Sequence, residues 1–155
     1  MEQGIADGAW NRAVAYVSLA LGAALGLVLG LWSFEGPLPP PSWLGEYADT
    51  PRRLVRLGHI AFFGLGILNL LVARDLPRLR LPQRQKRAVR TLMNFGNLIL
   101  PANLLAAGVF PPVKFLLPLP AVSVFSALLL VAVGAWRDVA ASVPAGELLP
   151  GERVP

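Results

Sequence analysis

Long runs without charged residues divide the chain into four apolar segments. These runs cover residues 13–32, 57–73, 91–110 and 115–136. A helix needs about 20 residues to cross the roughly 30 Å hydrocarbon layer, because each residue rises about 1.5 Å. Three runs reach that length unaided, and the second reaches it when extended back to Leu54, with Arg56 reaching the headgroups along its aliphatic stem. We therefore predict transmembrane helices at 13–32, 54–73, 91–110 and 115–136.

The four segments predict an all-α integral membrane protein, because lipid offers the backbone no hydrogen-bond partner outside helices and closed barrels. We expect one membrane domain, a bundle of four transmembrane helices arranged as two antiparallel hairpins. Composition agrees: the chain has 155 residues, 55% of them hydrophobic and 15% charged, with a mean hydropathy of +0.58. Residues 137–155, rich in proline and glycine, are expected to form an irregular tail.

The flanks of the first segment do not fit a secretory signal. Glu2, Asp7 and a single Arg12 precede it, and no small-residue cleavage site follows Trp32. A signal peptide begins instead with a basic region and ends at such a site. We expect the first helix to remain in the mature protein.

Basic residues predict the orientation in the membrane. The loop 74–90 contains half of the fourteen basic residues of the chain against one acid, Asp75. Loops rich in lysine and arginine stay on the cytoplasmic side, so both termini are expected there too, in the plasma membrane. Arg52, Arg53 and Arg56 oppose this assignment but are outnumbered. The basic residues of the loop are Arg74, Arg78, Arg80, Arg84, Lys86, Arg87 and Arg90.

This basic loop has two interpretations. Each charge near an anionic membrane surface contributes about 1 kcal/mol to binding, so the loop is expected to contact anionic lipid or an acidic partner. In the other interpretation, its charges only set topology. The part of the loop after Pro82 is expected to be helical already, since proline suits the first turn of a helix. We expect no nucleic-acid partner.

Small residues recur at every fourth position of the first helix, at Ser18, Gly22, Gly26 and Gly30. Helix association in lipid depends on close backbone approach and dispersion contacts, which such a groove permits. This spacing predicts a packing face. Its partner is either another helix of the same chain, which we favour, or another subunit.

The second helix carries the sole histidine of the chain, His59, on a face that continues to Gly66 and Asn69. Residues three, four and seven positions apart share one side of a helix, so these polar groups are expected to point inward. An antiparallel hairpin with the third helix would place His59 about one turn from Asn103. His59 is then a candidate haem ligand, a quinone or proton contact, or an interfacial side chain.

The third helix carries Asn94 and Asn97 about one turn apart, followed by Pro101. Proline removes a backbone hydrogen bond, so this helix is expected to kink. The same hairpin brings Asn69 level with Asn94. We predict a buried amide pair between Asn69 and either Asn94 or Asn97, serving as packing contacts or as the lining of a polar path.

One histidine and no cysteine restrict the chemistry of this chain. A catalytic metal site usually needs three protein ligands and bis-histidine haem needs two, so we expect no metal site and haem only with a ligand from another subunit. Nor does the chain contain a nucleophile motif, phosphate loop or metalloprotease signature, so we expect no enzyme.

Three hypotheses of function follow. The leading one is a small non-catalytic multi-pass subunit of a larger membrane complex, such as a respiratory or other electron-transfer assembly. It implies contacts with other membrane subunits or self-association, within the lipid bilayer. The alternatives are a haem- or quinone-binding membrane protein that uses His59 at a subunit interface, and a small transporter or channel.

Overall fold

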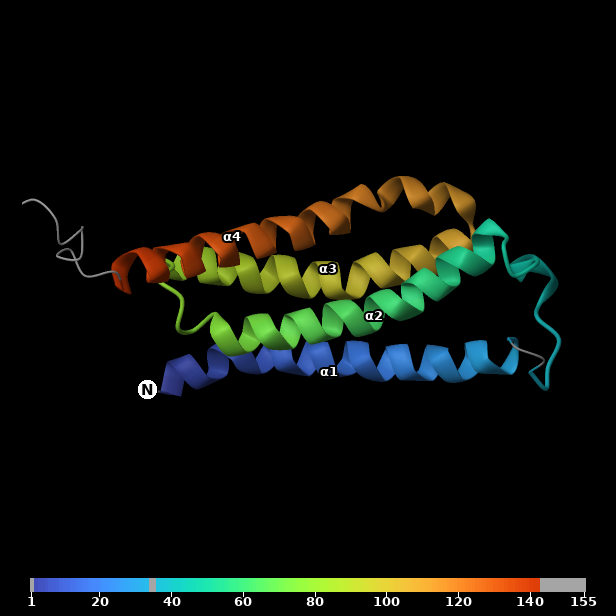
Figure 1. The fold of residues 1–155 in the computed structure, drawn as a ribbon, viewed down its shortest axis with the longest axis horizontal. Coiled ribbons are helices and arrows are strands. Elements are labelled where there is room, and N and C mark those ends of the chain that lie inside the picture. Colours follow the sequence, from blue (N-terminus) through green and yellow to red (C-terminus); the bar gives the residue numbers. More distant parts are fainter. Residues whose placement is uncertain (1, 34–35, 143–155) are drawn as a thin grey trace, which may run out of the picture.

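The computed structural model describes residues 2–33 and 36–142, with side chains from residue 8 onward. Regular structure in this part is entirely helical. The long helices are α1 (Glu2–Leu31), α2 (Thr50–Asp75), α3 (Gln83–Val109) and α4 (Pro118–Ser142), and the short 3-10 helices are η1 (Ser42–Leu44) and η2 (Pro111–Leu116). The long helices lie side by side along the long axis of the molecule (Figure 1).

The prediction of four helices long and apolar enough to cross a membrane is confirmed. The candidate spans are Gly8–Leu31, Thr50–Asp75, Gln83–Val109 and Pro111–Ser142. These helices are those of a multi-pass membrane protein. They also extend beyond the apolar runs in the sequence, because hydropathy marks the part of a helix suited to lipid and not the residue where the helix ends.

Proline residues account for two of the helix starts. Pro51 occupies the first turn of α2, and Pro82 immediately precedes α3, so the end of the basic loop is helical as expected. Proline fixes φ near its helical value, and it has no N–H of its own to leave unpaired in the first turn. At the other end of the chain, α4 continues to Ser142, into the expected irregular tail. The rest of that tail, 143–155, lies outside the described residues.

The helices pack in chain order as an open row. α1 packs chiefly on α2, α2 on α3, and α4 on α3, with a smaller contact between α1 and α3 (Figure 1). The apolar core lies between α2, α3 and α4. It is formed by Leu65, Val72, Leu76, Leu81, Val89, Met93, Val124 and Ala127. The outer faces of α1 and α4 therefore remain exposed on opposite sides of the row.

Candidate functional site

A chain of three buried asparagines joins α1, α2 and α3. Asn11 Nδ2 donates to Asn69 Oδ1 at 2.8 Å, and Asn69 Nδ2 donates to Asn94 Oδ1 at 2.9 Å. These side chains are 1%, 0% and 9% exposed in the order Asn11, Asn69, Asn94. Asn69 thus uses both ends of its amide between two other helices, and one of its bonds is the amide pair expected from the hairpin.

A second set of polar contacts lies farther along the same helices. Ser18 Oγ lies 2.8 Å from the Phe62 carbonyl oxygen and 2.9 Å from Asn97 Oδ1. A hydroxyl has one hydrogen, so these two acceptors share it. Asn97 Nδ2 is buried without a partner among the described atoms. The opposite amide orientation would pair Nδ2 with the Ser18 hydroxyl and leave its hydrogen to Phe62.

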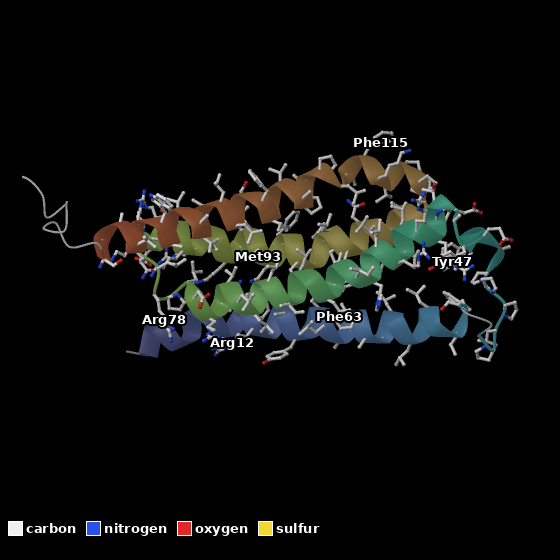
Figure 2. The ribbon with its side chains drawn as sticks, viewed as in Figure 1. Arg12, Tyr47, Phe63, Arg78, Met93 and Phe115 are labelled. Carbon is white, nitrogen blue, oxygen red and sulfur yellow. The ribbon has the colours of Figure 1, made fainter. Side chains whose placement is uncertain are left out.

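His59 packs against the glycine face of α1. Its Nδ1 lies 2.8 Å from the Gly22 carbonyl oxygen, and its ring meets Phe63 edge-on with centroids 5.3 Å apart. A carbonyl oxygen can only accept a hydrogen bond, so Nδ1 is the ring nitrogen that carries the hydrogen in this contact. A Cβ at Gly26 would lie 2.7 Å from His59 Cε1. The His59 ring therefore fits only because position 26 has no side chain. Phe63, which the ring contacts, lies between α1 and α2 (Figure 2).

His59 faces α1 and not α3, and helix geometry explains why. A Cβ at Gly58 would lie 3.1 Å from the Pro101 carbonyl oxygen, so Gly58 is the residue that faces α3. One residue further along a helix turns the side chain by about 100°, which directs His59 to α1. With its amide oriented to suit its neighbours, Asn103 instead donates to the Val113 carbonyl at 3.0 Å and accepts from Leu117 N–H at 3.3 Å.

The small-residue face of α1 has α2 of the same chain as its partner. A Cβ at Gly22 would lie 3.0 Å from the Phe63 ring. From the other helix, a Cβ at Gly66 would lie 3.0 Å from Leu19 Cγ and 3.3 Å from the Ala15 carbonyl oxygen. Gly30 differs, because no atom of the described residues lies within 4 Å of its Cβ position. Contact along this face therefore ends before the last turn of α1.

Two polar residues of the buried layer, Asn11 and Ser123, were not predicted from the sequence. Asn11 lies outside the apolar run, yet it precedes Ser18 by seven residues, or two helical turns, and so shares its face. That spacing was the available signal. Ser123 of α4 donates to the Leu92 carbonyl of α3 at 2.7 Å. Nothing in the sequence distinguishes it from the neighbouring Ser126.

The basic residues of the loop 74–90 have different surroundings. Lys86 is buried and donates to the Pro77 carbonyl at 2.8 Å, so it holds the loop in place and is not a surface charge. Arg80 forms an ion pair with Asp138 at 3.4 Å. Arg90 is half-buried. The exposed members of the set, apart from Arg80, are Arg74, Arg78, Arg84 and Arg87.

The buried polar groups thus serve mainly to connect helices. A pocket of about 310 Å³ lies elsewhere, between α3, η2 and α4, and its lining includes Ile99, Leu116, Leu119 and Pro120. Asn103 is its polar member, and that amide already has partners in Val113 of η2 and in Leu117, which follows η2. Such a lining suits an acyl chain better than a polar substrate. Comparison with protein-family models, with curated proteins and with solved structures gives no match for this chain.

Proposed function

We propose that this chain is a non-catalytic, multi-pass subunit of a larger membrane protein complex, and that α1 is the helix through which it docks. The observation that carries the proposal is the outward side of α1, where four exposed alanines recur beside the exposed Tyr16 and Leu27. We call this side the alanine face; its members are Ala9, Ala13, Ala20 and Ala24. Interfaces between membrane helices are enriched in small residues, because these let two backbones approach.

The glycine side of the same helix is already used within the chain. Gly22 and Gly26 pack on α2. A helix of another subunit that packs closely on α1 would therefore dock on the alanine face. The amide chain supports the same assignment, since Asn69 is bonded to both Asn11 and Asn94. Amides paired in this way hold helices together, which favours a packing role over a polar transport path.

We expect the double substitution Ala13→Leu/Ala20→Leu to release the partner subunit. Two larger side chains would keep another helix from reaching the α1 backbone, at a cost of about 1 to 3 kcal/mol, which corresponds to a roughly 5- to 150-fold loss of association. The measurement is mild-detergent purification of the tagged chain from its native membrane, followed by quantitative mass spectrometry of the subunits that accompany it.

The matched control is Ala121→Leu/Ala132→Leu, which makes the same changes at exposed positions of α4. This variant is expected to retain the partner. Retention of the partner by both double variants would contradict docking through α1. A wild-type chain that purifies only as a monomer or as a homomer would contradict the accessory-subunit proposal itself.

One observation favours a second candidate, a haem or quinone contact at a subunit interface. The hydrogen bond from His59 Nδ1 to the Gly22 carbonyl fixes the tautomer in which Nε2 has the free lone pair. Histidines that ligate metals are commonly oriented by such a bond. Haem would need its other axial ligand from the partner subunit. An absorption spectrum of the same purified complex decides this point. A Soret band that is lost in His59→Ala supports haem binding, and a colourless complex excludes haem.

We also propose that α1 with α2 and α3 with α4 form two antiparallel hairpins in the plasma membrane, with both termini in the cytoplasm. The exposed arginines of the loop 74–90 support this orientation. Tyr47, near η1, and Arg78 lie at opposite ends of the helices, so one end is expected outside and the other inside (Figure 2).

The chain contains no cysteine, so single cysteines report on orientation without background. Ser42→Cys and Arg78→Cys both replace exposed side chains, one at each end of the molecule. A membrane-impermeant maleimide applied to intact cells is expected to label Ser42→Cys, and to label Arg78→Cys only after permeabilisation. The reverse result would place the termini outside, and equal labelling of both would contradict a single orientation.

A further inference from the structure

Arginines gather at the end of the molecule opposite the basic loop. Arg52, Arg53 and Arg56 lie in the first two turns of α2. Tyr47, beside which two of them lie, is found at the end of the helices away from Arg78 (Figure 2). Loops on the side of the membrane opposite the basic loop are expected to be poor in basic residues. Three arginines at this end oppose the predicted orientation, so topology does not explain why they are there.

Two of these arginines form a cluster with one aromatic ring. The guanidinium carbon of Arg56 lies 3.9 Å from the centroid of the Tyr47 ring, and that of Arg52 lies 5.4 Å from it. Arg52 Nη2 also donates to the Trp32 carbonyl oxygen at 2.6 Å, beyond the last turn of α1. The two cations are therefore held in place together, where α1 ends and α2 begins.

Carboxylates do not neutralise this pair in the part of the chain that the structure describes. The ion pair of the described residues joins Arg80 to Asp138, and neither residue belongs to the arginine cluster. Asp49, the acid nearest in sequence, accepts a hydrogen bond from the Glu46 N–H at 2.8 Å through its Oδ2. Both arginines are half-buried. Partly desolvated guanidinium groups without a carboxylate are suited to bind a phosphate, whose oxygens match their paired N–H donors.

A small pocket lies beside the cluster. Its volume is about 60 Å³, and Leu29 and Leu44 form its apolar side while Ser33, Arg52 and Arg56 form its polar side. About 10 to 15 Å³ of such space holds one water, so the pocket has room for a phosphate group but not for a whole lipid. It opens where the apolar span of α1 ends, at Leu31, the depth at which lipid phosphates lie.

We propose that Arg52 and Arg56 bind the phosphate of an anionic phospholipid, in the leaflet opposite the basic loop. The apolar side of the pocket favours a lipid over free phosphate, because Leu29 and Leu44 would contact the glycerol end of the lipid. Arg53, which is exposed and follows Arg52 in the sequence, adds positive charge to the same end of α2. This site is separate from the alanine face of α1, so its test does not depend on the proposed docking function.

The test measures lipid binding to the purified full-length chain in detergent by native mass spectrometry, with phosphatidylglycerol as the probe. Each charge near a membrane surface contributes roughly fivefold to binding, so Arg52→Gln/Arg56→Gln is expected to weaken the tightest site by about thirtyfold. Arg56→Gln alone is expected to weaken it about fivefold. Among the described residues Arg56 makes no hydrogen bond, so the single variant remains informative if the double variant does not fold.

The matched control is Arg84→Gln/Arg87→Gln, which removes two exposed charges at the other end of the molecule. It is expected to leave the tightest site unchanged. The proposal is overturned by unchanged binding in Arg56→Gln and the double variant, or by equal weakening in the control. Phosphatidylcholine binding as tightly as phosphatidylglycerol would overturn the requirement for net negative charge. Inorganic phosphate displacing the bound lipid at equal concentration would overturn the lipid assignment in favour of a free anion.

Discussion

Replacing Gly96 by alanine is expected to push α4 away from α3 and to lower the free energy of unfolding by about 1 to 3 kcal/mol. A Cβ at this position would collide with Val124 and would lie 3.2 Å from the Pro120 carbonyl oxygen. Valine is stiff at χ1, and a backbone carbonyl cannot turn aside, so the helices themselves must move. Thermal or denaturant unfolding of the purified chain in detergent measures the loss.

Gly64→Ala is the matched control, because no atom in the described part of the chain lies within 4 Å of its Cβ position in α2. It is expected to leave stability unchanged or slightly raised, since alanine favours the helix more than glycine. Adding Val124→Ala to Gly96→Ala is expected to recover part of the loss by removing the collision. Equal losses at positions 64 and 96, or no coupling between Gly96 and Val124, would show that close packing is not the cause.

The importance of Gly96 could not be predicted from the sequence. On α1 the small residues repeat every fourth position, which is a signal within one helix. Gly96 stands without such a repeat, and its role depends on which side of α4 carries Val124 and Pro120. The four spans were predictable because apolar length is a local property. The order of helices in an open row was not, because it depends on which faces meet.

The buried polar layer shows the same limit. The short connection between α2 and α3 sets the register of those helices, so the pairing of Asn69 with Asn94 could be expected. The connection between α1 and α2 is long, and it leaves the register of α1 undefined from the sequence. The bonds of α1 through Asn11 and Ser18, and the contact of His59 with Gly22, therefore appear only in the structure.

Asn69→Ala is expected to have the largest effect among the polar substitutions, lowering the free energy of unfolding by about 2 to 4 kcal/mol. Interhelical hydrogen bonds in membranes contribute about 0.6 kcal/mol each on average, and Asn69 makes two. Its removal also leaves Asn11 Nδ2 and Asn94 Oδ1 without these partners in a buried site, which adds the cost of unpaired polar groups. Unfolding of the purified chain in detergent measures the change.

Asn11→Ala is the comparison for Asn69→Ala, because Asn11 stands at one end of the chain of three asparagines and Asn69 at its centre. Asn11 contributes a single hydrogen bond through Nδ2, and its Oδ1 has no partner among the described atoms, so its removal is expected to cost about 1 kcal/mol. Once Asn69 is alanine, Asn11→Ala is expected to cost less still, because its partner is already gone. Equal costs for the two single variants would contradict a connected chain. Unchanged stability in Asn69→Ala, together with loss of the partner subunit, would make Asn69 a functional contact and not a packing one.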